Sequence, residues 1–171
     1  MIEVYSRLFV GSALDYESTI SHQTGWAVVH ACKEPYHRQA LGYSGRAAPN
    51  THPEYLVAHR GKRLMLNIVD ADNPGFFAKS MIDQALDFIE QQYSEELNVL
   101  VHCNQGESRG PSIALTYMAA RLQALPNESL EAAEQPFKTL YPYYNPKPGI
   151  RGHIKQYWQQ YCNSQRGDGR T

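Results

Sequence analysis

A single cysteine and a single arginine carry most of the chemistry that this sequence offers. Cys103 follows the apolar run 98–101 and His102, and Arg109 comes six residues later, after a loop that contains Gly106. A thiol near a guanidinium and the start of a helix ionises readily, and the thiolate is the nucleophilic form. The planar guanidinium matches two oxygens of a phosphoryl group. The spacing therefore predicts a site where sulfur attacks a bound phosphate.

The loop between these two residues predicts an anion-binding cradle. Its members are Asn104, Gln105, Gly106, Glu107 and Ser108. Backbone amides in a strand-to-helix loop can surround an anion, helped by the positive end of the helix dipole. The nucleotide-binding pattern GxxxxGK[ST] is excluded, because the loop lacks the lysine and the second glycine at that spacing. We expect no metal and no cofactor, because amides and arginine can neutralise the developing charge.

Two aspartates are candidates for the proton that the leaving oxygen needs. Asp70 and Asp72 lie on a turn directly after the apolar run 63–69. A carboxylic acid on such a neighbouring loop can donate the proton and later act as base on the hydrolytic water. From their position alone, either aspartate could serve.

The elements that must hold these residues alternate along the chain. The patterns predict strands over 7–12, 26–32, 63–69 and 98–103, and helices over 76–93, 109–125, 127–136 and 150–162. Residues 33–63 are rich in glycine and proline, which predicts mostly loop. Strands separated by helices indicate a single-domain α/β fold with a central, mostly parallel sheet flanked by helices. In such folds the ligand site lies beyond the carboxyl ends of the strands.

The composition is typical of a soluble globular protein. The chain has 171 residues, 42% of them hydrophobic and 19% charged, with a net charge of −1. Three widely spaced cysteines are a poor disulfide framework and suit a reducing compartment. The first residues do not form a signal peptide, and no apolar run is long enough for a membrane span. We expect a cytoplasmic monomer with no nucleic-acid or membrane partner.

The stretch "VHCNQGESR" resembles the HCxxGxxR signature of cysteine-dependent protein tyrosine phosphatases, and most of all their dual-specificity branch. "LFVGS", "LNIVDAD" and "SIALTYMA" resemble other segments of that branch. The resemblance implies its fold, a cysteinyl-phosphate intermediate, a phosphorylated protein or peptide substrate, and a catalytic domain over 1–162 with a flexible tail over 163–171. Aligned without a gap, Asp72 falls on the family's general acid and Asp70 does not.

The sequence departs from this family at two positions near the expected site. Gly110 stands where the family usually has Ser or Thr to assist turnover, and the next hydroxyl is Ser112. We therefore expect a phosphocysteine that persists longer than in relatives with the hydroxyl. Lys147 follows Pro146 where the family often has Asn. His102 is expected to orient the loop rather than carry a proton.

Several alternatives remain open from the sequence. Cys32 could be a redox partner of Cys103, as the resemblance to some lipid phosphatases implies, or a buried structural residue. The substrate could be a phosphoinositide, an RNA 5′ phosphate or a phosphoglycan, although Glu107 and the absence of lysine in the cradle disfavour highly anionic substrates. The six Lys/Arg of the 33–63 insertion could guide an anionic substrate or simply be solvated. An inactive binding module is disfavoured, because cysteine, arginine and aspartate are all present.

Overall fold

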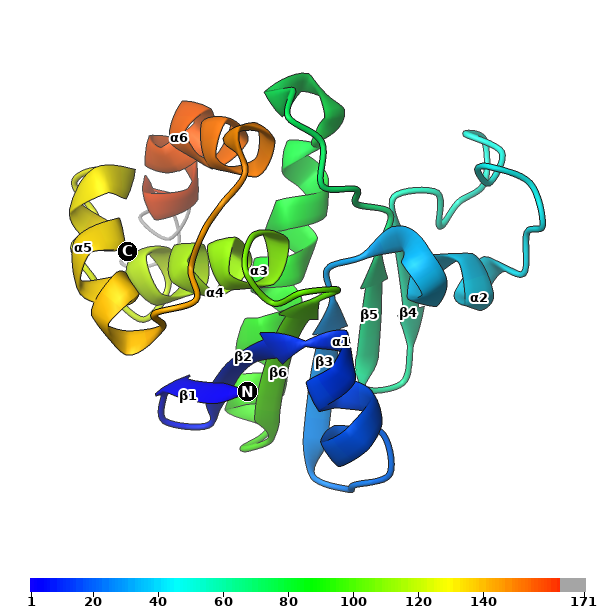
Figure 1. Cartoon of the computed structure of the whole chain (residues 1–171), viewed down its shortest axis with the longest axis horizontal. Helices are drawn as coiled ribbons and strands as arrows, with labels where there is room; N and C mark the ends of the chain where they lie inside the picture. Colours follow the sequence, from blue (N-terminus) through cyan, green and yellow to red (C-terminus); the bar gives the residue numbers. More distant parts are fainter. Residues whose placement is uncertain (164–171) are drawn as a thin grey trace, which may run out of the picture.

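A computed structural model describes residues 1–163 of the chain. These residues form one six-stranded sheet in the order β1-β2-β6-β3-β5-β4 (Figure 1). The strands are β1 (Ile2–Tyr5), β2 (Leu8–Ser12), β3 (Trp26–His30), β4 (Val57–Arg60), β5 (Arg63–Leu66) and β6 (Asn98–Cys103). The inner pairs are parallel and the two edge strands, β1 and β4, are antiparallel to their neighbours. The predicted α/β architecture with a mostly parallel sheet is confirmed.

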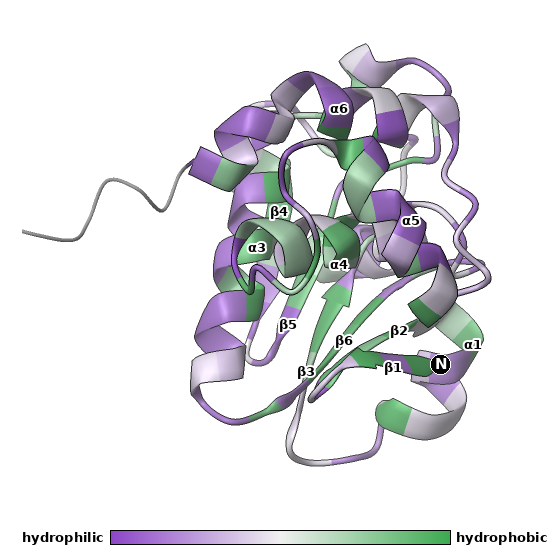
Figure 2. Cartoon of the chain, turned by 90° about the vertical axis from the view of Figure 1, so that its left-hand side faces the viewer, coloured by the Kyte–Doolittle hydropathy of each residue, from purple (hydrophilic) through white to green (hydrophobic). Residues whose placement is uncertain are grey.

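Helices cover both faces of this sheet. They are α1 (Ala13–Asp15), α2 (Arg38–Leu41), α3 (Lys79–Ser94), α4 (Arg109–Ala120), α5 (Leu130–Leu140) and α6 (Pro148–Asn163), with shorter turns η1 (Tyr16–Ile20), η2 (Lys33–His37) and η3 (Pro74–Phe76). The larger core lies between the sheet and α3 to α6, whereas η1 and η2 supply the smaller core on the other face. Figure 2 shows the apolar strands β3, β5 and β6 enclosed by these layers.

Strand β6 illustrates how the sequence divides its side chains between the two faces. Val99, Val101 and Cys103 pack into the larger core, while Leu100 packs into the smaller one. This alternation follows from the two-residue repeat of a strand. Because both faces are covered, the strand is a continuous apolar run, as expected for an inner parallel strand.

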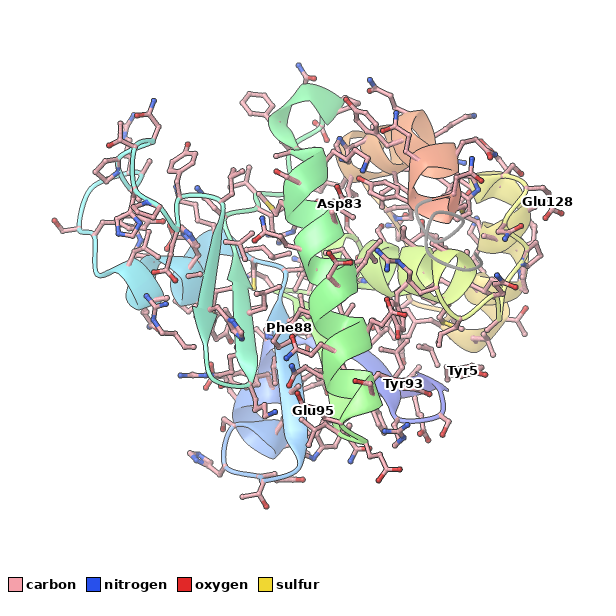
Figure 3. All side chains as sticks on the ribbon, turned by 180° about the vertical axis from the view of Figure 1, so that it is seen from behind. Tyr5, Asp83, Phe88, Tyr93, Glu95 and Glu128 are labelled. Atoms are coloured by element: carbon pink, nitrogen blue, oxygen red, sulfur yellow. The ribbon has the colours of Figure 1, made fainter. Side chains whose placement is uncertain are left out.

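Helix α3 lies across the back of the sheet and buries one apolar stripe. Figure 3 shows this side, with Asp83, Phe88 and Tyr93 along the helix. Its buried residues recur at three- and four-residue steps: Met81, Ile82, Ala85, Leu86, Phe88, Ile89 and Gln92. The helix starts three residues later than predicted, because Pro74–Phe76 form a separate 3-10 turn whose cap is Asn73, with Oδ1 accepting from the Gly75 N–H at 2.8 Å.

The sequence prediction missed short elements in one segment and misplaced the bounds of one helix. The segment 33–63 is mostly loop, as predicted, but it also contains η2, α2 and β4, and β4 pairs with β5 through a two-residue turn at Gly61, where φ is +60°. Helix α5 begins at Leu130 after its cap Ser129, and it continues past Pro136 to Leu140. A proline costs one backbone hydrogen bond there. The buried Phe137 beyond it holds the helix against the core.

Candidate active site

A hollow of about 270 Å³ lies at the carboxyl end of β6, at the start of α4. The loop residues that line it were all predicted from the sequence: Cys103, Asn104, Gln105, Glu107, Ser108 and Arg109. The other lining residues are Asp70, Asn145 and Lys147. The structure therefore collects a thiol, a guanidinium, a carboxylate and an ammonium from three separate segments.

Cys103 and Arg109 occupy opposite ends of the loop, and both are nearly buried. Cys103 is the last residue of β6 and Arg109 is the first of α4, with exposures of 2% and 7%. The guanidinium is fixed from two sides, because Nη1 donates to the Ile68 carbonyl oxygen at 3.1 Å and Nη2 to Asn104 Oδ1 at 2.8 Å. Its buried Nε has no hydrogen-bond partner within residues 1–163, and the nearest carboxylate oxygen is Asp70 Oδ1 at 3.9 Å.

Asp70 lines the hollow, and Asp72 does not. Asp70 Oδ1 accepts a hydrogen bond from Ser108 Oγ at 2.9 Å and lies 3.9 Å from Arg109 Nε. Asp72 is exposed on the turn beyond it. The ungapped alignment selects Asp72, whereas the structure places Asp70 in the hollow that Cys103 also lines.

Lys147 adds a cation that the sequence analysis did not assign to the site. Its Nζ lies 3.9 Å from Asp70 Oδ2, and its side chain is 53% exposed at the mouth of the hollow. The backbone N–H of Lys147 donates to Ser108 Oγ at 3.0 Å. In the sequence, Lys147 stands in the segment Pro146-Lys147-Pro148 before a helix. That pattern does not predict that Lys147 lies beside Asp70.

The loop packs closely on the strands beneath it, which explains two glycines. Gly106 has φ +77°, and a Cβ there would lie 2.8 Å from the carbonyl carbon and oxygen of Gly11. At Gly110, a Cβ would lie 2.8 Å from the carbonyl carbon of His102 and 3.0 Å from the Cys103 nitrogen. The start of α4 therefore rests directly on the β6 backbone, and the family's usual Ser or Thr has no room at position 110.

Ser112, the next hydroxyl after Gly110, is 1% exposed and is not among the residues that line the hollow. Its supporting role stays a prediction.

His102 lies beneath the hollow in a buried cluster of rings. Its Nε2 is 2.7 Å from Nδ1 of His30, which is the paired residue on β3, and its Nδ1 is 3.4 Å from the Cys103 carbonyl oxygen. Tyr16 stacks on His102, and Tyr36 stacks on His30. Burial lowers the pKa of His102 to about 4 and that of His30 to about 2, so the pair is neutral near pH 7. An orienting role fits this neutral pair, and His30 was not predicted.

Cys32 packs in the smaller core with Tyr16 and Tyr36, whereas Cys103 packs in the larger one. Both thiols are free. Burial raises the pKa of Cys32 to about 12; the nearby Cys103 thiol also raises this pKa, and Arg109 lowers it. Cys32 therefore lies near the site, and its redox role stays a prediction.

The sequence profile of the "Dual specificity phosphatase, catalytic domain" family matches residues 45–157. The chain belongs to this family. Rat dual specificity protein phosphatase 5 is 33% identical over 78 residues, covering 46% of the chain and 19% of that protein. Human dual specificity protein phosphatase 9 is 25% identical over 123 residues, covering 60% of the chain and 32% of that protein. The matched stretches thus span less than a third of either relative.

Solved structures of dual specificity phosphatases share the fold over nearly the whole chain. Human DUSP28 superposes with a TM-score of 0.62 at 18% identity, covering 99% of this chain and 100% of that one. DUSP15 superposes with a TM-score of 0.63 at 18% identity, covering 100% of this chain and 98% of that one. PTPMT1 superposes with a TM-score of 0.61 at 15% identity, covering 98% of this chain and 99% of that one. At these identities the likeness concerns the fold. No helix among residues 1–163 is long and apolar enough to cross a bilayer.

Proposed function

We propose that the chain hydrolyses phosphomonoesters through a cysteinyl-phosphate intermediate, and that its substrate is a phosphorylated protein or peptide. One observation carries this proposal: a single hollow is lined by Cys103, Arg109 and Asp70. Membership of the dual specificity phosphatase family supports the same reaction class. The roles below are assigned from geometry and from this membership.

In the first step the Cys103 thiolate attacks the phosphorus atom, and an S–P bond forms. The bond from phosphorus to the leaving oxygen breaks with its electron pair on oxygen, and Asp70 supplies the proton that this oxygen takes up. Arg109 Nε and the amides of residues 104–108 stabilise the charge on the transferring phosphoryl group. In the second step water attacks phosphorus, its proton passes to the Asp70 carboxylate, and the S–P bond breaks to return the thiolate.

The test is a substrate panel with the wild type and Cys103→Ser. The panel contains 4-nitrophenyl phosphate, phosphotyrosine and phosphoserine peptides, a phosphoinositide and a 5′-phosphorylated RNA. We expect phosphate release from the aryl phosphate and at least one phosphopeptide, and background rates for the serine variant. A wild type inactive on the whole panel, or a serine variant with full activity, would refute the reaction class.

The assignment of the acid is tested separately with Asp70→Asn and Asp72→Asn. A general acid contributes about 10²–10⁴-fold, and it matters most for poor leaving groups. Asp70→Asn should therefore lower kcat/KM on phenyl phosphate by about 10²-fold or more, with a smaller loss on 4-nitrophenyl phosphate. Asp72→Asn should change both rates little. The reverse pattern would return the role to Asp72.

One observation favours the second candidate, a phosphomonoester that is not a protein. Lys147 places an ammonium at the mouth of the hollow, although the cradle itself has no lysine. A substrate with a second anionic group near its phosphate would gain from this cation. Faster hydrolysis of the phosphoinositide or the RNA than of every phosphopeptide in the panel would favour this candidate.

A further inference from the structure

Residues 145–149 comprise the end of the connection between α5 and α6 and the first two residues of α6, and their backbone links the phosphate loop to the acid. The Asn145 N–H donates to the Glu107 carbonyl oxygen at 2.9 Å, and the Lys147 N–H donates to Ser108 Oγ at 3.0 Å. Ser108 Oγ in turn donates to Asp70 Oδ1 at 2.9 Å. Two of these bonds therefore run in series from the connection to the carboxyl group.

The start of α6 also touches the turn that follows Asp70. Gly149 is the second residue of α6, and a Cβ there would lie 1.9 Å from the carbonyl oxygen of Ala71. One turn later, a Cβ on Gly152 would lie 2.7 Å from Cγ of Pro74. Helix α6 thus offers a surface without side chains on which residues 71–74 rest. Any side chain at position 149 must push the Ala71 backbone away.

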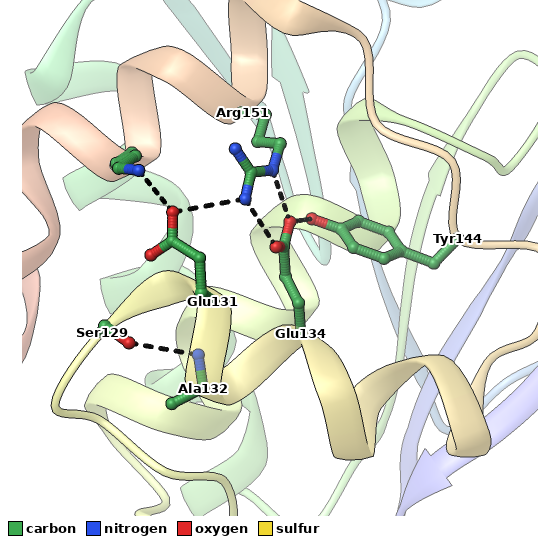
Figure 4. Close-up of polar contacts among 7 residues, drawn as sticks. Ser129, Glu131, Ala132, Glu134, Tyr144 and Arg151 are labelled. Atoms are coloured by element: carbon green, nitrogen blue, oxygen red, sulfur yellow. Dashed lines mark hydrogen bonds and ion pairs between the residues drawn. The ribbon is translucent and has the colours of Figure 1, made fainter.

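Both ends of this connection are fixed to one buried carboxylate on α5 (Figure 4). Glu134, which is 4% exposed, accepts from Arg151 Nε and Nη2 at 2.8 Å each. The Tyr144 hydroxyl donates to Glu134 Oε1 at 3.1 Å. Tyr144 precedes residues 145–149 and Arg151 follows them. Because the Arg151 guanidinium donates two hydrogen bonds to the Glu134 carboxylate, it fixes both the distance and the relative orientation of the two groups. A single charge contact would not fix their orientation.

We propose that residues 145–149 form a bracket that holds Asp70 in position to donate its proton, with Gly149 and Glu134 as positioning residues. The proposal rests on the function proposed above and deepens it. Neither Gly149 nor Glu134 lines the hollow, so neither contacts the reacting atoms directly. A misplacement of about 1 Å can cost 10²-fold in rate. Gly149 acts on the acid through the backbone of Ala71, which it contacts directly.

The first test is Gly149→Ala, assayed on two aryl phosphates. We expect kcat/KM to fall by about 10²-fold on phenyl phosphate, whose leaving group needs the proton, and only a few-fold on 4-nitrophenyl phosphate. Competitive inhibition by inorganic phosphate should change little, since Gly149 contacts Ala71 and Phe77 and not the phosphate loop. Alanine favours a helix over glycine by roughly 1 kcal/mol, so a lost helix is not the cause. The matched control is Gly45→Ala, where a Cβ meets nothing within 4 Å and both rates should match the wild type.

Glu134→Gln provides a second variant if Gly149→Ala does not fold. It keeps the side-chain shape and removes the charge that holds Arg151, on a helix that touches neither the acid nor the hollow. We expect the same preferential loss on phenyl phosphate, with unchanged inhibition by phosphate. A merely destabilised protein would lose both aryl phosphates equally.

The double variant Asp70→Asn with Gly149→Ala separates positioning from general damage. If Gly149 acts through Asp70, adding Gly149→Ala to Asp70→Asn should cause no further loss on phenyl phosphate. Fully additive losses would overturn the bracket. Equal losses on the two aryl phosphates in Gly149→Ala would also overturn it. A wild type that hydrolyses neither compound would instead refute the proposed function.

Discussion

Replacing Gly110 by serine supplies the hydroxyl that dual specificity phosphatases usually carry after the arginine. The structure predicts that this substitution is costly. A Cβ at position 110 would lie 2.8 Å from the His102 carbonyl carbon, 3.0 Å from the His102 Cα and 3.0 Å from the Cys103 nitrogen. All three are backbone atoms of an inner strand, so no side-chain rotation can relieve the contact. Helix α4 must move away from β6.

The expected loss follows from the size of this overlap. Adding atoms to a closely packed site costs about 1–3 kcal/mol. Replacing glycine inside a helix returns roughly 0.5 kcal/mol. The net loss is therefore about 0.5–2.5 kcal/mol, which for a chain of this length lowers Tm by roughly 1–10 °C. The shift of α4 also moves Arg109, its first residue, so phosphate binding should weaken.

Thermal unfolding followed by circular dichroism measures the first effect, and rapid-quench trapping of the phosphoenzyme measures the second. We expect Gly110→Ser to melt lower and to release phosphate from the cysteine no faster than the wild type. Gly45→Ser is the control, since a Cβ there meets open space. If Gly110→Ser melted at or above the wild type and released phosphate faster, α4 would have room for the hydroxyl. The packing argument for Gly110 would then fail.

Three further predictions follow from the site. Arg109→Lys should weaken inhibition by inorganic phosphate by at least about 10-fold, because a single ammonium cannot replace the several directed donors of a planar guanidinium. Titration with inorganic phosphate gives the inhibition constant, and an unchanged constant would contradict a phosphate-binding role for Arg109. After peroxide treatment, mass spectrometry should find no Cys32–Cys103 crosslink, because burial raises the pKa of Cys32 to about 12 and keeps its thiol protonated and unreactive. His30 and His102 should destabilise the fold as pH falls below about 6.5, since burial lowers the pKa of each histidine in the folded chain and the unfolded chain takes up protons first. Denaturant titration should show a free energy of unfolding that is lower at pH 5 than at pH 7 by about 2 kcal/mol per histidine. This difference should be smaller in His30→Phe, and an equal difference in both proteins would refute the prediction.

The loop residues were predictable because their chemistry depends on short spacings. Cys103, Gly106 and Arg109 lie within seven residues of one another, and one strand end and one helix start are enough to bring them together. The same holds for α3, whose apolar stripe marks the buried face. In each case the feature depends on residues that are close in the sequence, so a short sequence pattern was enough to predict it.

The choice between Asp70 and Asp72 could not be made in this way. The two carboxyls are two residues apart on one turn, and what separates them is contact with residues far along the chain. Ser108 and Lys147 lie beside Asp70, and Gly149 presses on Ala71 directly after it. An ungapped alignment carries no information on these contacts. Strand β4 was missed for a related reason, since its pairing with β5 outweighs the glycines and prolines around it.

The position of Lys147 changes what the charges of the site predict about the substrate. From the loop alone, Glu107 and the missing lysine disfavoured highly anionic substrates. In the folded chain Lys147 reaches the same hollow, where its ammonium lies beside Asp70. Because a bound phosphate is negatively charged, the Lys147 ammonium can attract it to the hollow, and the same ammonium lies 3.9 Å from Asp70 Oδ2. Lys147 is thus close to both the acid and the substrate of the proposed reaction, so a substitution there should affect substrate binding and proton transfer together.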